Sequence, residues 1–133
     1  MATQETGLEP NCAHCGKRSV FALGKGLSSD KNFPKGHVYY CQPCEAYVEL
    51  AGGGFRALGT PASSSLWRFR ESLKRDLDKL VHRWAKAKRI TVEECRIKTT
   101  QWAAKAVSQP TFDLERMTED QCKQLDLLLD QYF

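Results

Sequence analysis

The pattern of hydrophobic and polar residues changes character near the middle of the chain. In the first half, short apolar runs over residues 19–23, 37–40 and 46–50 have the length and composition of β-strands. Residues 24–36, between the first two runs, contain Gly, Ser and Pro and predict a long hairpin loop. We therefore expect a three-stranded sheet, too small to build a core of its own.

Beyond residue 60 the apolar residues repeat at helical spacing. Gly52-Gly53-Gly54 separates this part from the strands and can be a hinge or a place of close backbone packing. Thr60 and Pro61 predict the start of a long helix that continues to Lys88. One face of this helix carries Leu66, Phe69, Leu73, Leu77, Leu80 and Trp84.

Two shorter helices are predicted by capping-box patterns, Thr91-x-x-Glu94 and Thr118-x-x-Gln121. The inward positions of the first are Val92, Cys95, Thr99, Trp102, Ala103 and Ala106. Those of the second are Cys122, Leu125, Leu128, Leu129 and Tyr132. Cysteines on apolar helix faces are usually buried and unreactive, and the alternatives for Cys95 and Cys122 are a second metal site or a redox switch.

The remaining four cysteines form two Cys-x-x-Cys pairs, Cys12/Cys15 and Cys41/Cys44, separated by 25 residues. Such pairs present four thiolates to one ion, and Zn²⁺ is the ion that a tetrahedral sulfur set usually holds. Gly16 follows the first pair, where the turn favours a positive φ. Two disulfides are the alternative, and His14 could replace a cysteine ligand, contact a phosphate or face solvent.

These features predict an α+β protein, with a three-stranded zinc ribbon followed by a long basic amphipathic helix and two shorter helices. The expected organisation is a disordered tail at 1–10, the zinc ribbon at 11–54 and a helical domain at 55–133. Four cysteine ligands leave the zinc no open position for water, so one structural ion and no catalysis are expected. The chain also lacks the common motifs of phosphate loops, serine hydrolases and metalloproteases.

The net charge of +4 is unevenly distributed. Residues 61–90 carry 9 Lys and Arg against 3 Asp and Glu, whereas residues 91–133 carry 5 against 8. Hydrophobic content of 41% and charged content of 27% are ordinary for a soluble domain, and no apolar run is long enough to cross a membrane. The first residues do not resemble a signal peptide, which predicts a cytoplasmic protein.

Cations gather on the side of the long helix opposite its apolar face. They are Arg68, Arg75, Lys79, Arg83 and Lys86, with His82 beside them. Such a row can bridge several phosphates, and the alternative is a solvated face. The ribbon adds Lys17, Arg18 and Lys35, with Lys25, Lys31, Phe33 and His37 in and next to the hairpin loop, where exposed aromatic rings could stack on bases. An ordinary polar loop is the alternative there.

The motifs of the ribbon resemble a zinc-finger-containing family of bacterial and phage proteins catalogued as a domain of unknown function. The resemblance is carried by Cys12, Cys15 and Gly16, by Tyr39-Tyr40-Cys41, by Cys44, Ala46, Tyr47 and Val48, and by Leu58-Gly59-Thr60. It continues with Arg70, Leu77, Asp78 and Leu80, with Arg96 and Trp102, and with Gln121-Cys122. It implies a zinc ribbon with an appended helical part and a role in phage or mobile-element biology.

This chain departs from the family pattern at three places where the family tends to carry histidine. They are occupied here by Ala51, Lys74 and Asp113, so any chemistry of those histidines would be lost. The resemblance brings no assigned activity.

Two functions are consistent with these observations. The first is non-catalytic binding of nucleic acid, DNA rather than RNA, through phosphate contacts with low sequence specificity. The second is a protein–protein adaptor that docks on a host or phage enzyme through the ribbon and the basic helix. No membrane partner is expected, and a phage-encoded protein would act in the host cytoplasm.

Overall fold

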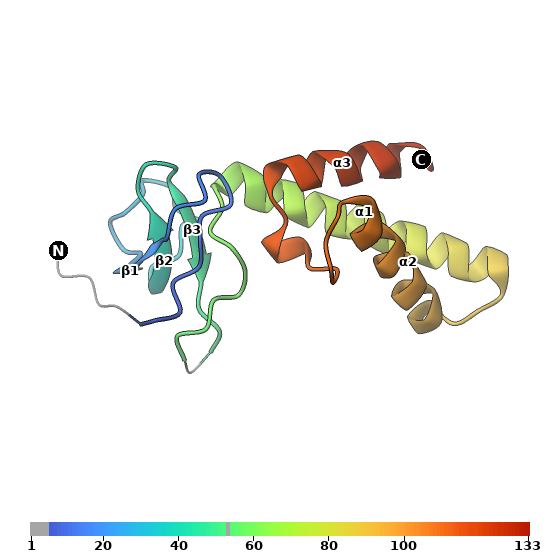
Figure 1. The fold of residues 1–133 in the computed structure, drawn as a ribbon, viewed down its shortest axis with the longest axis horizontal. Coiled ribbons are helices and arrows are strands. Elements are labelled where there is room, and N and C mark those ends of the chain that lie inside the picture. Colours follow the sequence, from blue (N-terminus) through green and yellow to red (C-terminus); the bar gives the residue numbers. More distant parts are fainter. Residues whose placement is uncertain (1–5, 53) are drawn as a thin grey trace. The chain divides into compact units, whose positions relative to one another are not determined.

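A computed structural model describes residues 6–52 and 54–133 of the chain. It contains three strands, β1 (Val20–Leu23), β2 (His37–Cys41) and β3 (Ala46–Glu49), followed by α1 (Ser64–Lys88), α2 (Val92–Ala106), the short 3₁₀ helix η1 (Leu114–Arg116) and α3 (Glu119–Asp130) (Figure 1). The chain divides into two compact units, Met1–Trp67 and Arg68–Phe133. The α+β class and the order of elements predicted from the sequence are confirmed.

The first unit is an antiparallel sheet in the order β1-β2-β3. Phe21 lies opposite Tyr39, and Tyr39 lies opposite Val48, so these three side chains share one face. They form a small core with Leu50, Ala57 and Trp67 packed against it. Phe33, Val38 and Tyr40 belong to a second small cluster in the same unit.

The segment after β3 stays with the sheet. Leu50 and Ala57 form an isolated bridge, as do Tyr47 and Ala62, and the Trp67 Nε1–H donates to the Tyr47 carbonyl at 2.7 Å. The division between the units therefore falls later in the chain than the boundary expected at residue 54. Gly53, in the middle of the predicted glycine hinge, lies outside the described residues.

The predicted tail is only partly described, because residues 1–5 lie outside the described range. Residues 6–10 make specific contacts with the rest of the first unit. Ser19 donates its backbone N–H to the Pro10 carbonyl at 3.0 Å, and Arg18 pairs with Glu9 at 2.7 Å. These contacts fix the chain just before the first cysteine.

The start of α1 corrects the prediction made from Thr60 and Pro61. The helix begins at Ser64, and the Ser63 Oγ accepts a hydrogen bond from the Leu66 N–H at 3.3 Å, as an N-cap residue does. Pro61 and Ala62 precede this turn, and Ala62 exchanges two backbone hydrogen bonds with Tyr47. The bridge to β3 therefore delays the helix by several residues.

In the second unit, α1 buries the expected apolar face. Leu73, Leu77 and Leu80 are buried, and Val81 and Ala85 pack with Cys95 of α2. Trp84, Trp102 and Tyr132 form a cluster of edge-to-face rings with centroids 5.3–5.7 Å apart. Ala106 was predicted to face inward but is exposed, and Ala104 and Val107 are buried near that end of α2.

Both predicted helix caps are present. Thr91 Oγ1 accepts from the Glu94 N–H at the start of α2, and Thr118 with Gln121 forms a complete capping box at the start of α3. Among the described helices, none is long and apolar enough to cross a membrane.

Candidate metal centre and cationic surfaces

The first Cys-x-x-Cys pair lies in a tight turn that precedes β1. The Gly16 N–H donates to the Cys12 carbonyl at 2.9 Å, and the His14 N–H approaches the Cys12 Sγ at 3.3 Å. Gly16 has the positive φ that the sequence suggested, at 73°. This turn brings the sulfurs of Cys12 and Cys15 to the same side of the backbone.

The second pair also lies in a turn, at the end of β2. Cys41 is the last residue of the strand, and the turn that follows is closed by a hydrogen bond from the Glu45 N–H to the Gln42 carbonyl at 3.1 Å. Glu45 takes the positive φ here, at 51°, although it is not glycine. Ala46 then begins β3 and packs with Cys12 and Cys41.

The four sulfurs meet in one cluster. The Sγ atoms of Cys12, Cys15, Cys41 and Cys44 all lie within 4.8 Å of one another, and those of Cys15 and Cys41 are 3.6 Å apart. A tetrahedral ion with metal–sulfur distances of about 2.3 Å separates its sulfurs by roughly 3.8 Å. A disulfide would need a sulfur–sulfur distance of about 2.05 Å. The cluster therefore fits a metal ion, and none of the four cysteines is in a disulfide.

The surroundings of the sulfurs shift their acidities in opposite directions. A hydrogen bond from the Lys17 backbone lowers the pKa of Cys15 to about 7, whereas burial raises the pKa of Cys41 and raises the pKa of Cys44 to about 12. An ion that binds four thiolates must displace protons, above all at Cys44. Metal binding and proton release are therefore coupled at this site.

His14 does not take the place of a cysteine ligand in this arrangement, in which the cluster consists of four cysteines. Its Nε2 accepts a hydrogen bond from the Ser63 N–H at 3.0 Å, just before α1 begins. The ring thus links the first metal-binding turn to the start of the helix. This contact joins residues 49 positions apart and has no signal in the sequence.

The predicted cations of α1 all lie on its exposed side. Arg68, Arg75, Lys79, Arg83 and Lys86 are exposed. Arg83 is engaged, because it donates to the Tyr132 carbonyl and lies over the Phe133 ring, 5.1 Å from its centroid. Within the described residues, no ion pair involves Arg68, Arg75, Lys79 or Lys86. Asp78 pairs instead with Arg96 at 2.8 Å and His82 at 3.6 Å.

The predicted cations of the ribbon fall into two groups. Lys17 and Arg18 follow the first metal-binding turn and are exposed, with Arg18 paired to Glu9. Lys35 lies in the hairpin loop with Lys25 and Lys31. Phe33 is not the exposed ring that the sequence suggested, because it is only 7% exposed and packs on Tyr47 with ring centroids 4.5 Å apart. His37 stacks on Phe21 at 4.8 Å.

One arginine of α1 has a different role that sequence reasoning did not assign. Arg70 is 2% exposed and donates two hydrogen bonds to the Met117 carbonyl, from Nε at 3.2 Å and from Nη2 at 2.6 Å. The Met117 carbonyl holds this guanidinium inside the second unit. It is a packing residue and not part of the cationic surface.

No family model, curated protein or solved structure matches this chain. The site geometry and the placement of charge are therefore the basis for the functional proposal.

Proposed function

We propose that this protein binds nucleic acid without catalysing a reaction, and that a structural zinc ion holds its sheet unit together. Four thiolates at tetrahedral distances select Zn²⁺ over harder ions, and they fill its coordination sphere. A filled sphere has no place for an activated water, which supports a structural role. The family resemblance adds an accessory role in phage or mobile-element biology to this proposal.

The observation that carries the proposal is the separation of charge from apolar surface on α1. Leu73, Leu77 and Leu80 are buried, while Arg68, Arg75, Lys79 and Lys86 are exposed and free of ion pairs within the described residues. We call these four cations the α1 row. From Arg68 to Lys86 the row extends about 27 Å at 1.5 Å per residue. That length reaches several phosphates of one backbone.

The chemistry of the row favours phosphate contacts over base recognition. Long, exposed, flexible cations neutralise the phosphate charges of nucleic acid and release their counterions. This contribution to the binding free energy does not depend on the base sequence. We expect DNA to be the main ligand, with weak sequence preference and strong salt dependence. Arg83 contributes less than its position suggests, since Tyr132 and Phe133 already hold its guanidinium.

The test uses the double variant Arg75→Ala/Lys79→Ala and a duplex DNA fragment, with binding measured by fluorescence anisotropy over a range of salt concentrations. Each lost contact to duplex phosphate lowers the slope of log K against log salt by about 0.9, so the double variant should lose about 1.8. The loss should be similar on unrelated sequences, and RNA is measured alongside.

The matched control is Lys98→Ala/Lys123→Ala. These lysines belong to the same unit and carry the same charge, but each pairs with a glutamate one turn away, Glu94 and Glu119. The control should bind like the parent. If the parent binds neither DNA nor RNA at low salt, or the two double variants behave alike, the proposal is wrong.

An adaptor that binds an acidic protein surface is the second candidate. It is favoured by exposed apolar side chains of the second unit, of which Ile97 at 58% and Leu127 at 68% are the most exposed. This alternative would be supported if the parent protein binds no nucleic acid but binds a protein partner, and if the Arg75→Ala/Lys79→Ala variant no longer binds that partner.

A further inference from the structure

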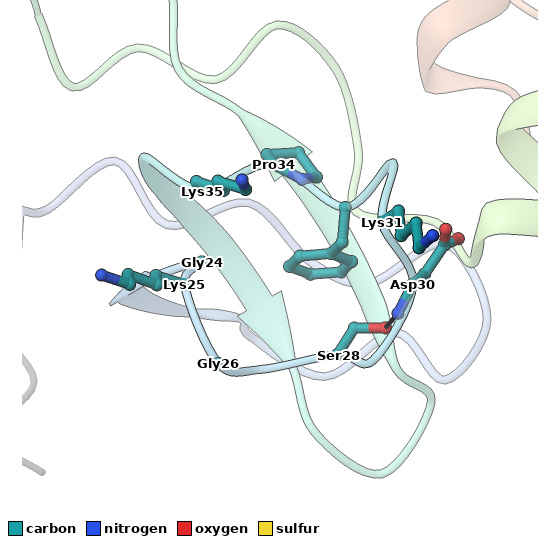
Figure 2. Close-up of a pocket in the computed structure, with 9 residues that line it drawn as sticks. Gly24, Lys25, Gly26, Ser28, Asp30, Lys31, Pro34 and Lys35 are labelled. Atoms are coloured by element: carbon teal, nitrogen blue, oxygen red, sulfur yellow. Dashed lines mark hydrogen bonds between the residues drawn. The ribbon is translucent and has the colours of Figure 1, made fainter.

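The loop between β1 and β2 lines a half-open pocket of about 370 Å³. Its lining includes three lysines, Lys25, Lys31 and Lys35, together with Phe33 and Pro34. Lys25 and Lys35 lie together on one side of the loop, and Lys31 lies with Asp30 on the other (Figure 2). All three lysines are exposed, so their amines stand at the rim.

Hydrogen bonds fix the shape of this loop. The Gly24 N–H donates to the Gly36 carbonyl at 2.7 Å and closes its base. Ser28 Oγ accepts from the Asp30 N–H at 3.1 Å, and Asp30 Oδ1 accepts from the Asn32 N–H at 3.0 Å. Gly26 has a φ of +86°, which favours glycine. The pocket is therefore a built feature of the hairpin.

The lining combines an apolar part with positive charge. Phe33 is buried against Tyr40 and Tyr47, and with Pro34 it offers carbon surface to the pocket. The three lysines outnumber the single carboxylate of Asp30, and one oxygen of that carboxylate already accepts a backbone hydrogen bond. A ligand that suits this lining has a ring body and an anionic group.

We infer that the pocket binds one unpaired nucleotide, with its phosphate at the lysines and its base toward Phe33 and Pro34. This inference rests on the proposed binding of nucleic acid. Small-molecule sites have volumes of about 300–1,000 Å³, so this pocket has room for a single small ligand and not for a stacked base pair. A base held in a duplex cannot enter, whereas an unpaired base can be turned outward. The pocket therefore selects single strands, while the α1 row binds either form.

The test compares Lys25→Ala/Lys35→Ala with Arg75→Ala/Lys79→Ala and the control Lys98→Ala/Lys123→Ala. Each is titrated with short oligothymidylate and with duplex DNA over a range of salt concentrations. Single strands lose about 0.7 of salt slope per lost phosphate contact. Because one phosphate is placed at the lysines, the pocket variant should lose about 0.7 of salt slope on oligothymidylate and nothing on the duplex. In the parent, thymidine 5′-monophosphate should shift the NMR amide signals of Gly24, Gly26 and Ser28 more than thymidine or inorganic phosphate does.

The outcomes separate the two proposals. The pocket inference is overturned if the pocket variant loses the same salt slope on oligothymidylate as on duplex, or loses none on either. The proposal for the α1 row is then still judged by the Arg75→Ala/Lys79→Ala variant. If inorganic phosphate shifts the same signals as fully as the nucleotide, the site is a simple anion site and the inference is again overturned. A parent that binds neither oligothymidylate nor duplex overturns nucleic-acid binding itself.

Discussion

Replacing Arg70 should destabilise the helical unit much more than replacing Arg75, although both are arginines of α1. Arg70 is 2% exposed and satisfies the buried Met117 carbonyl with two hydrogen bonds, whereas Arg75 is exposed. Burial lowers the pKa of the Arg70 guanidinium. Burial also raises the pKa of the Cys122 thiol, and the positive charge of Arg70 partly offsets that rise.

Two variants separate the contributions of the hydrogen bonds and of the apolar stem of Arg70 to the free energy of unfolding. Arg70→Met keeps an unbranched apolar stem and removes the donors, so the Met117 carbonyl is left unsatisfied at a cost of about 1–3 kcal/mol. Arg70→Ala also removes two methylene groups, Cγ and Cδ, worth about 0.8 kcal/mol each, or roughly 1.6 kcal/mol together. Removing the guanidinium also ends the cost of burying its charge, which offsets part of both losses. We therefore expect about 1–2 kcal/mol for Arg70→Met and about 2–4 kcal/mol for Arg70→Ala.

Urea unfolding followed by far-UV circular dichroism measures this difference, because the helices dominate that signal. Arg75→Ala is the control and should change the free energy of unfolding by less than about 0.5 kcal/mol. If Arg70→Met is as stable as Arg75→Ala, then Arg70 contributes no net stabilisation through Met117. Its assignment as a packing residue would then be wrong.

The remaining predictions concern the cysteines. Native mass spectrometry should find one zinc ion per chain, and Cys12→Ser or a strong chelator should unfold the sheet unit while the helical signal of residues 68–133 persists. A metal-free protein, or a disulfide among Cys12, Cys15, Cys41 and Cys44, would contradict this. Cys95 and Cys122 are 3% and 0% exposed, so both should react slowly with an alkylating reagent in the metal-bound protein. Fast labelling of either without denaturant, measured by intact mass, would show that α2 and α3 do not cover them.

Periodicity was sufficient to predict the three strands and the three α-helices, but not η1 or the first residue of α1. The strands agree with the apolar runs to within a residue at each end, and the helix caps at Thr91 and Thr118 are where the capping patterns place them. The four metal ligands were also predictable, because the spacing of Cys-x-x-Cys pairs is set by the turn that presents them. Each of these features depends on residues that are close together in the chain.

Other features depend on tertiary contacts or on unusual backbone, which the sequence did not indicate. α1 ends at Lys88 as predicted, but it stops through Arg89, which has a φ of 57°, and the Ile90 N–H donates to the Ala85 carbonyl at 3.1 Å. α2 ends in the same way at Ser108, with a φ of 61°. Both are Schellman-type stops, which glycine usually marks, and neither has glycine here.

The burial of the Arg70 side chain could not be predicted from the sequence either. Its burial depends on the Met117 carbonyl, 47 residues away, and a helical wheel cannot show that partner. The pocket of the hairpin loop also depends on a contact between its ends that composition does not reveal.

The contact between Gly24 and Gly36 has a consequence for how this protein could be redesigned. A Cβ atom added at Gly24 would lie 2.1 Å from the Pro34 carbonyl oxygen and 2.8 Å from that of Gly36, so only glycine allows the two ends of the loop to meet. Because the loop is closed at its base, its exposed side chains are not needed to bring β1 and β2 together. Phe33 is different, because it packs on Tyr40 and Tyr47 in the core of the sheet unit. The exposed positions between residues 25 and 32 can therefore be treated as an exchangeable cassette: their side chains can be altered to change what the pocket accepts, while Phe33, the sheet and its cysteines stay as they are.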